Sequence, residues 1–454
     1  MDGLEAAIEK MRAEGLGDAA VESFARQYER LRAGETGTLA ESEIEPVADL
    51  PDAEDLSEVA DAALLDQAVV IKLNGGLGTS MGMTQAKSLL KVKEGRSFLD
   101  LIAEQILDRR ERSGARLPLI LMNSFATQAD SLAALERYDD LSAGLPADFV
   151  QNKVPKLRAD DLAPVAWPDD PALEWAPPGH GDLYTALVTS GMLGALLDGG
   201  YRYAFVSNSD NLGAVLDPRI LAWLASTGAP FLMEVADRTS SDRKGGHLAR
   251  RVSDGGLVLR EIAQTPDDDV DAFQDTARHR YFNTNTLWVD LHALRDALGG
   301  AGVVDLPMIV NRKTVDPGDA GSTPVIQLET AMGAAIGVFE GAAALRVPRS
   351  RFVPVKTTND LLSLRSDAYV IGEGRAVFLA PSRDGVPPFV DLDPEYYKLV
   401  GRFDARFVGG APSLVGCEAL RVRGDVTFGA DVVVRGEVEV EGPARVEDGA
   451  VLEG

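Results

Sequence analysis

The sequence predicts an α/β fold in which a mainly parallel sheet carries helices on both faces and a small parallel β-helix follows at the C-terminus. Two patterns carry this prediction. From about residue 60, short continuous apolar runs alternate with helical patterns, as in sheets that are buried on both faces. After about residue 370, apolar residues recur every six positions, which is typical of β-helical coils. The length of 454 residues allows two to three domains.

The first 55 residues are expected to form one or two exposed helices and an acidic linker. Two sets of apolar residues there have helical spacing: Leu4, Ile8 and Met11, and then Phe24, Tyr28 and Leu31. Residues 41–55 are acidic and contain Pro46 and Pro51, which favours a connector. We therefore assign residues 1–55 to a solvated helical appendage with its linker.

Strand and helix signals then alternate up to about residue 370. The expected strands are Ala68–Leu73, Leu117–Met122, Tyr203–Ser207 and Phe231–Val235. Between the first two, Ser97 and Asp100 form an S-x-x-D helix start that precedes an apolar face. A second helix is expected from Asp182 to Leu197, despite two glycines within it. This alternation indicates β-α-β units in one domain over residues 56–370.

The C-terminal region, residues 371–454, follows a different pattern. Apolar residues stand at intervals of six at Leu420, Val426, Val432, Val438 and Ala444. Glycines at 424, 436 and 442 fit the same interval, with Ala430 in the position between the first two. The segment is long enough for about two coils of a parallel β-helix. The alternative is a valine-rich hairpin meander.

Composition and charge exclude several classes of protein. The chain has 45 basic and 71 acidic side chains, a formal net charge of −26, which argues against binding to nucleic-acid backbones or anionic membranes. Cys417 is the only cysteine, so there is no intramolecular disulfide and no Cys-based zinc site. No apolar run approaches the ~20 residues of a membrane helix, and the N-terminus is unlike a secretory signal. We therefore expect a cytoplasmic protein.

The strongest chemical signal is the segment VIKLNGGLGTSMGMTQAK, residues 70–87, in which a buried strand runs into a loop with four glycines. Glycines let the backbone approach a ligand and turn its N–H groups toward phosphates. The segment lacks the Gly-Lys-Ser/Thr of a P-loop and the third glycine of G-x-G-x-x-G, which disfavours Walker-type and dehydrogenase assignments. Lys87 offers a positive charge for a polyphosphate. The alternative is a flexible turn with a surface lysine.

Two further segments carry polar residues at expected element ends. In APPGHGDLY, residues 176–184, His180 lies between two glycines just before a helix, whose N-terminus favours an anion. In FVSNSDNLG, residues 205–213, Asp210 follows the carboxyl end of a buried strand, where a carboxylate suits Mg²⁺. The alternatives are a structural turn around His180 and an Asx turn at Asp210.

Three further segments are weaker signals, and for each taken singly a turn or edge position is the more ordinary explanation. Glu234 follows a strand, Asn283 and Asn285 offer amides suited to sugar hydroxyls, and Lys356 stands at an expected strand end.

Together these segments resemble the UTP–glucose-1-phosphate uridylyltransferase family, also called UDP-glucose pyrophosphorylase, of the eukaryotic-like type. The segments that carry the resemblance are LNGGLGTSMGMTQAKS, PPGHGDLY, VSNSDNLG, FNTNTLW, IQLETAMGAAI and VPVKTTNDLL, over roughly residues 65–370. The resemblance implies a Rossmann-like nucleotidyltransferase (GT-A-like) mixed sheet as the catalytic domain and a left-handed C-terminal β-helix. The N-terminus is shorter than in many relatives, which leaves any regulatory role for it open.

The resemblance also implies roles for individual residues. Those that would bind UTP are Leu73, Asn74, Gly75, Gly76, Lys87, Gln151, Gly179 and Asp210. Those that would bind the sugar phosphate are His180, Asn208, Glu234, Asn283, Glu329 and Lys356. Lys87 and Lys356 would be catalytic, and Asp210 would hold Mg²⁺.

The implied reaction joins UTP and glucose 1-phosphate to UDP-glucose and pyrophosphate. The sugar phosphate is already ionised near pH 7, so an in-line attack on the α-phosphorus needs no general base and no covalent enzyme intermediate. Positioning and charge neutralisation would carry the catalysis.

Three alternatives remain open at this point. A UDP-N-acetylhexosamine pyrophosphorylase resembles this family, but typically has Gly-Asn-Gly where this chain has Gly179, His180 and Gly181. A non-catalytic UDP-sugar-binding protein is disfavoured by the presence of both Lys87 and Lys356. A hexad-repeat acyltransferase is weak because two coils form no acyl-donor cleft.

The last expectation concerns association between copies of the chain. Two coils cannot bury all their valines, and an uncapped end leaves strand edges that invite pairing. Val446 and Val451 stand near that end. We therefore expect residues 418–454 to form a self-association surface, most simply a two-fold dimer. The alternative is that the segment only packs on the catalytic domain.

Overall fold

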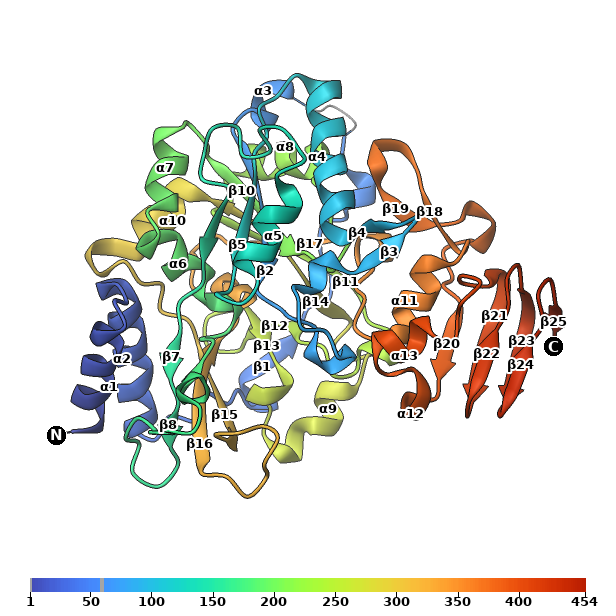
Figure 1. Ribbon diagram of the computed structural model, residues 1–454. Coiled ribbons are helices and arrows are strands. Elements are labelled where there is room, and N and C mark those ends of the chain that lie inside the picture. Colours follow the sequence, from blue (N-terminus) through green and yellow to red (C-terminus); the bar gives the residue numbers. More distant parts are fainter. Residues whose placement is uncertain (1, 58–60) are drawn as a thin grey trace.

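The computed structural model describes residues 2–57 and 61–454 (Figure 1). A ten-stranded mixed sheet forms its centre, with the strand order β1-β12-β14-β10-β2-β5-β6; β13 pairs with β12, and β11 pairs with β14 and β17. These strands are β1 (Ile44–Pro46), β2 (Ala68–Asn74), β5 (Leu119–Asn123), β6 (Asp148–Val150), β10 (Tyr203–Asn208), β11 (Phe231–Asp237), β12 (His247–Arg251), β13 (Leu257–Arg260), β14 (Tyr281–Asp290) and β17 (Ala343–Arg346).

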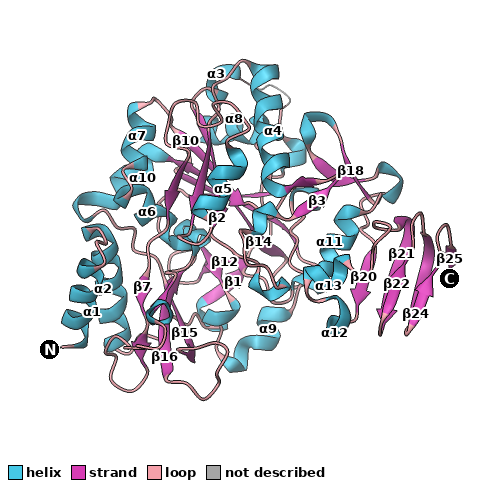
Figure 2. Ribbon diagram, in the orientation of Figure 1, coloured by secondary structure: helices cyan, strands magenta, loops and turns pink. Residues whose placement is uncertain are grey.

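Helices cover both faces of this sheet, as the sequence predicts (Figure 2). On one face, α4 (Phe98–Ser113) and α8 (Pro218–Thr227) pack against Val70 and Phe205. On the other, α6 (Leu183–Thr189), α7 (Met192–Asp198) and α10 (Leu291–Leu298) pack against Ile71 and Val206. The other helices are α1 (Gly3–Ala13), α2 (Asp18–Arg32), α3 (Ala62–Leu65), α5 (Gln128–Leu135), α9 (Val270–Gln274), α11 (Thr358–Arg365), α12 (Pro394–Tyr397) and α13 (Val400–Asp404).

The four expected strands are confirmed as β2, β5, β10 and β11, with ends shifted by one or two residues. Strands β10, β2, β5 and β6 run parallel, but β14 is antiparallel to both β10 and β11, so the sheet is mixed rather than mainly parallel.

The capping box of α4 is also confirmed: the Ser97 hydroxyl accepts from the Asp100 N–H at 3.2 Å, and the Asp100 carboxylate accepts from the Ser97 N–H at 2.9 Å. The expected helix 182–197 is two helices, because Gly191 at φ +75° breaks it.

Smaller sheets surround the central one. The first contains β15 (Met308–Thr314), β16 (Pro324–Thr330) and β8 (Leu157–Arg158). Three further pairs are β3 (Lys91–Lys93) with β4 (Arg96–Ser97), β7 (Val154–Pro155) with β9 (Trp175–Ala176), and β18 (Tyr369–Ile371) with β19 (Val377–Leu379). Within the described residues, no helix is both long and apolar enough to cross a bilayer.

The expectation of a solvated N-terminal appendage is wrong. Helices α1 and α2 lie against β7 and β16 (Figure 1) and share a core with them. Met11, Phe24 and Tyr28 are buried there against residues such as Leu157 and Leu328. The helical spacing of the apolar residues correctly indicates two amphipathic helices. The strands that cover their apolar faces come from distant parts of the sequence.

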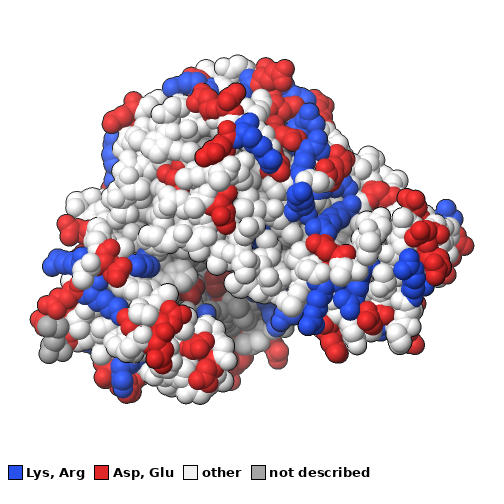
Figure 3. All heavy atoms as spheres, viewed as in Figure 1, with Lys and Arg blue, Asp and Glu red and all other residues white. Residues whose placement is uncertain are grey.

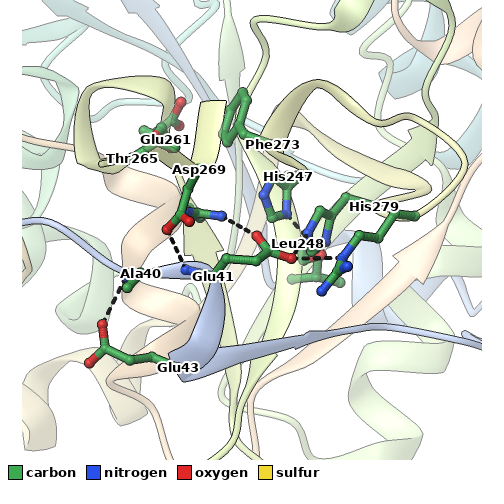
Figure 4. A network of polar contacts seen from close by, with 12 residues as sticks. Ala40, Glu41, Glu43, His247, Leu248, Glu261, Thr265, Asp269, Phe273 and His279 are labelled. Carbon is green, nitrogen blue, oxygen red and sulfur yellow. Dashed lines mark hydrogen bonds and ion pairs between the residues drawn. The ribbon is translucent and has the colours of Figure 1, made fainter. Parts of the chain in front are cut away.

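The linker is not a free connector either, since it joins the central sheet. Residues 44–46 form β1, which pairs with β12, and Asp52 forms an ion pair with Arg346 beside β17. Figure 4 shows Glu41 at the centre of a buried network. Its carboxylate accepts from Arg260, Arg278 and His279, and its N–H donates to Asp269. Two acidic residues of this segment, Glu41 and Asp52, are therefore partners for cationic side chains of the folded domain, and Arg260 among these is fully buried.

The histidines of this network predict an acid-sensitive stability. His247 is fully buried and stacks on His279, with ring centroids 3.8 Å apart. Burial lowers the pKa of His247 to about 2, and the neighbouring His279 contributes in the same direction. The unfolded chain takes up a proton below about pH 6.5 while the folded chain does not, so the free energy of unfolding falls as the pH falls.

From pH 7 to pH 5, His247 alone should remove about 2 kcal/mol from the free energy of unfolding. His247→Phe keeps an aromatic ring in place and removes the ionisation, so it should flatten the pH dependence by that amount. Urea unfolding at both pH values measures this. His292→Ala, at an exposed histidine, is the control and should leave the slope as it is. An equal slope in wild type and His247→Phe would contradict the prediction.

The C-terminal region contains two parallel ladders. One consists of β20 (Phe389–Leu392), β21 (Ser413–Arg423), β23 (Val433–Glu441) and β25 (Val451–Glu453), and the other of β22 (Val426–Phe428) and β24 (Ala444–Val446). Their registers pair Leu420 with Val438 and Val433 with Val451, eighteen residues apart in both cases. Parallel strand pairing at an interval of eighteen residues, which equals three hexads, is thus present. The hexad residues are buried from Leu420 to Val438, whereas Ala444 is exposed at the open end.

Candidate active site

The candidate site lies where several parallel strands end. Strands β2, β5 and β10 run side by side, and their register pairs Leu73 with Asn208 and Asn74 with Asn123. The loops that follow the three strands therefore meet at one edge of the sheet, which is where open α/β sheets bind ligands. Figure 3 shows a hollow in this face between the part that carries β2 and β5 and the part that carries β15 and β16.

The base of the glycine-rich loop is fixed by hydrogen bonds. The side-chain amide of Asn74 donates to Asn123 Oδ1 and to Ser131 Oγ, both at 2.7 Å, and its Oδ1 accepts from Ser209 Oγ. The Asn74 side chain is thus used within the protein, so only its backbone is available to a ligand. Gly78 and Gly82 have φ values of +67° and +74°, which other residues adopt only with strain.

Lys87 and Asp210 form an ion pair at the centre of the site. The Lys87 Nζ lies 2.6 Å from Asp210 Oδ2, and both side chains are about one-fifth exposed. The Lys87 N–H donates to the carbonyl of Gly76, which ties the lysine to the glycine-rich loop. A cation and an anion are thereby held next to the flexible backbone that a phosphate would approach.

Gln151 lies against the first glycine of the loop. A Cβ atom at Gly75 would come within 3.0 Å of Gln151 Oε1, so a larger residue there would displace the amide. The Gln151 N–H donates to the carbonyl of Asn123 at the end of β5. The structure therefore brings together Gln151, Gly75 and Gly76, three residues expected to bind UTP.

The His180 loop packs on the end of β16. A Cβ atom at Gly179 would lie 2.4 Å from the Thr330 carbonyl oxygen, and one at Gly181 would lie 2.3 Å from Thr330 Oγ1, so both positions require glycine. The Met332 N–H donates to His180 Nδ1 at 3.0 Å. Burial lowers the pKa of His180 to about 4. The ring is therefore neutral near pH 7 with its proton on Nε2, where it can donate to a ligand.

Two other expected sugar-phosphate ligands lie near this loop. Glu329, on β16, lines a small cavity together with Gly181 and Asp182, and a Cβ atom at Gly179 would lie 3.1 Å from Glu329 Cβ. Asn283 lies on the other side of Met332: a Cβ atom at Gly333 would come within 2.7 Å of its Nδ2. Asn283 Nδ2 donates to Asn285 Oδ1, which fixes the amide.

Asn208 and Lys356 flank the Asp210 loop. Asn208 ends β10 two residues before Asp210. Lys356 is exposed, with its Nζ 5.6 Å from the ring centroid of Phe352. Its segment is tied to the Asp210 loop, because the Val355 N–H donates to the Asp210 carbonyl at 3.3 Å.

Glu234 does not belong to this group, and its expected contact with a sugar hydroxyl is corrected. The side chain is completely buried. Its carboxylate accepts from Arg351 Nε and Nη2, both at 2.7 Å, and from Trp288 Nε1 at 2.8 Å. A buried carboxylate needs such partners, and these occupy both of its oxygens. Glu234 therefore stabilises the core beneath the site.

The structure also reveals polar residues that the motifs did not single out. Asn211 bridges two loops: its Oδ1 accepts from the Val353 N–H at 2.8 Å, and its Nδ2 donates to the Arg351 carbonyl. Lys72 lies inside β2. A charged residue within an otherwise apolar run is the sequence feature that could have indicated its importance. Asp182 is buried against Asn152, and burial raises the pKa of Asp182 to about 7.

Comparison with known proteins extends these observations. The family model described as UTP–glucose-1-phosphate uridylyltransferase matches residues 21–435. The protein of that name from Hordeum vulgare is 40% identical, with 100% of this chain and 96% of that protein covered. The protein from Saccharomyces cerevisiae is 42% identical over 82% of this chain and 74% of its own length.

Solved structures of similarly named proteins have the same fold as this chain. UDP-glucose phosphorylase from Trypanosoma brucei has a TM-score of 0.91 at 47% identity, covering 99% of this chain and 98% of that one. A variant of UDP-glucose pyrophosphorylase from Leishmania major, solved in complex with UDP-glucose, has a TM-score of 0.93 at 44% identity, covering 100% of this chain and 98% of that one. The similarity extends over the C-terminal region as well as the central sheet.

Proposed function

The chain belongs to the UTP–glucose-1-phosphate uridylyltransferase family, and from that premise we propose that it joins UTP and glucose 1-phosphate to form UDP-glucose and pyrophosphate. The observation that carries the proposal beyond the family is the Lys87–Asp210 pair at the ends of two parallel strands, beside the glycine-rich loop. A phosphate transfer requires a cation and a carboxylate at such a place.

In the proposed reaction, an oxygen of the sugar phosphate attacks the α-phosphorus of UTP and pyrophosphate leaves. The attacking oxygen carries its negative charge already, so no side chain has to remove a proton. The work of the protein is to hold two anions in line and to reduce their repulsion. Lys87 offers a positive charge to the nucleotide phosphates, and the neutral His180 donates from Nε2 to the sugar phosphate.

Lys356 is assigned to the two phosphates that are being joined. Its segment is attached to the Asp210 loop through Asn211 and Val355, which supports a common site for the lysine and the carboxylate. Gly75, Gly76, Gln151 and Gly179 are assigned to UTP through the backbone and amide groups described above. Glu329, Asn208 and Asn283 are assigned to the sugar phosphate.

Asp210 fits a role as magnesium ligand. Lys87 donates to its Oδ2, which leaves Oδ1 as an acceptor on the same carboxylate. Among the residues that the structure describes, no group of three or more His, Cys, Asp or Glu side chains could hold a metal by itself. Mg²⁺ commonly binds through one or two carboxylates and substrate phosphates, so the donor set here suits an ion that arrives with the nucleotide. When bound, Mg²⁺ would neutralise part of the phosphate charge.

Pyrophosphate release tests the function. The purified chain is incubated with UTP and a panel of sugar 1-phosphates that includes glucose 1-phosphate and N-acetylglucosamine 1-phosphate, with ATP, CTP and GTP as nucleotide controls. We expect the highest kcat/KM with UTP and glucose 1-phosphate. Tight UTP binding without pyrophosphate would contradict the proposal, as would a preference for the N-acetylated sugar. A cytoplasmic setting also belongs to the proposal, and cell fractionation tests it.

For the C-terminal region we propose a short left-handed β-helix whose open end mediates self-association. The support is the eighteen-residue register and the exposed end of the last coil, where Val451 is 52% exposed on β25. Deleting residues 418–454 is not a clean test, because Leu420 and Val434 belong to the core that contains Val70. The C-terminal region also reaches the glycine-rich loop outside the deleted residues, since Leu399 lies against Gly82.

A point variant tests self-association without removing the segment. Val451→Asp places a charge on the exposed edge and should shift a dimer toward monomer in light scattering at micromolar concentration, with turnover retained. Val386→Asp, at an exposed valine outside the coils, is the control and should leave the mass unchanged. A wild-type chain that is already monomeric at high micromolar concentration would refute the association.

A further inference from the structure

One charged residue lies inside β2, a buried strand of the central sheet. Lys72 is 2% exposed, and its strand neighbours Val70 and Ile71 are 1% and 0% exposed. Burying an ammonium group is costly unless it is paired and hydrogen-bonded. An uncharged, unbranched side chain one atom shorter, such as methionine, would satisfy most of the packing. The presence of a lysine therefore calls for an explanation in terms of its contacts.

The Lys72 ammonium donates to the two ends of one loop. Its Nζ lies 2.6 Å from Ser207 Oγ and 2.8 Å from the carbonyl oxygen of Ala214. Ser207 is the register partner of Lys72 on the parallel strand β10, so their side chains share a face. Ala214 comes four residues after Asp210. The lysine thus joins the start and the end of the 207–214 loop, which carries Asp210 at its centre.

The other contacts of this loop hold it from the opposite side. Asn211 bonds to the Arg351 and Val353 backbone, as described above. Glu234, Arg351 and Asp210 are the charged groups that act electrostatically on Lys72, and the Phe205 ring lies 5.5 Å from its Nζ. Burial lowers the pKa of Lys72 to about 7, and Arg351 contributes to the lowering, while Glu234 and Asp210 oppose it.

We propose that Lys72 is a positioning residue that holds the 207–214 loop closed, so that Asp210 stays where it meets Lys87 and the substrate phosphates. The inference rests on the proposed function. Lys72 lies beneath the site and acts through Asp210. If its ammonium is removed, Ser207 Oγ and the Ala214 carbonyl lose a charged donor and the loop can relax. Misplacing a reacting group by about 1 Å can cost up to about 10²-fold in rate.

Lys72→Met keeps an unbranched apolar side chain that is one atom shorter and removes the ammonium. We expect kcat for pyrophosphate release to fall by at least about tenfold. We also expect half-maximal activity to require a higher Mg²⁺ concentration, while the KM for glucose 1-phosphate changes little. Lys156→Met is the matched control: Lys156 is also buried, at 4% exposure, and its Nζ donates to the Val315 carbonyl at 2.8 Å, away from the loop. The control should lose thermal stability to a similar extent and keep kcat.

A double-mutant cycle with Asp210→Asn separates positioning from general damage to the fold. If Lys72 acts through Asp210, Lys72→Met should cost much less in the Asp210→Asn background than in wild type. Additive losses, or an unchanged kcat in Lys72→Met, would overturn the inference. If Lys72→Met does not fold, Ser207→Ala removes one of the two acceptors and enters the same cycle. An inactive wild type would refute the proposed function itself, whereas an active wild type with additive losses refutes only the role of Lys72.

Discussion

Lys87→Ala is expected to lower kcat/KM for pyrophosphate release by at least about 10²-fold, because a charged contact to a transferring phosphate contributes a few kcal/mol to transition-state stabilisation. The lysine has two functions that alanine cannot replace. Its ammonium lies beside the glycine-rich loop that is expected to receive the phosphates, and it pairs with Asp210 at 2.6 Å. Without it, Asp210 adds unopposed negative charge to a site that must accept two anions.

The fold should survive this substitution, because the Lys87 side chain is partly exposed and lies at the sheet edge rather than in the core. A partly exposed ion pair contributes little to stability. Lys91→Ala is the control, since Lys91 is an exposed lysine four residues further along the chain. Steady-state kinetics and a thermal melt of both variants check the prediction. Near-wild-type turnover in Lys87→Ala would refute the phosphate role of the lysine.

What the sequence predicted well was encoded locally. The capping box of α4 depends on Ser97 and Asp100, three positions apart, and both of its hydrogen bonds are present. The hexads are likewise local: Leu420, Val426, Val432 and Val438 are buried, and Leu420 pairs with Val438 in a parallel register. A continuous apolar run such as β2 needs only its own composition to be recognised as a buried strand.

What the sequence did not predict depends on residues that are far apart in the chain. Glu234 looked like a free carboxylate at a strand end, and its true partner, Arg351, is 117 positions away. The apolar faces of α1 and α2 were recognised, but the strands that contact them, β7 and β16, lie far along the chain, and β16 is some three hundred residues beyond α2. Periodicity indicates that one face of a helix is apolar, but it does not identify the element that buries this face.

The site shows the same division. The loops could be placed at one sheet edge because parallel strands end together. Which polar groups remain free to bind a ligand could not be predicted, because this depends on which groups are already hydrogen-bonded within the protein. Asn74 donates to Asn123 and Ser131, and Lys72 donates to Ser207 and Ala214. Such pairing decides which residues remain available to a ligand.

Asp210→Asn should lower kcat by about 10²-fold and shift half-maximal activity to higher free Mg²⁺, because a neutral amide is a poor ligand for a hard cation. The substitution keeps the shape of the side chain. The 207–214 loop should also keep its conformation, since Lys72 and Asn211 hold it through other atoms. The loss of activity would therefore result from the missing charge rather than from a change in folding.

Titration of activity against free Mg²⁺ at saturating UTP measures the shift. Asp290→Asn is the matched control: Asp290 is a buried carboxylate that caps α10 and pairs with Arg202, at the opposite edge of the sheet because β14 runs antiparallel to β10. It should lose stability and keep the Mg²⁺ titration of wild type. If Asp210→Asn also leaves the titration unchanged, the nucleotide phosphates alone hold the metal. The carboxylate would then serve only as the partner of Lys87, and Lys87→Ala and Asp210→Asn should become non-additive.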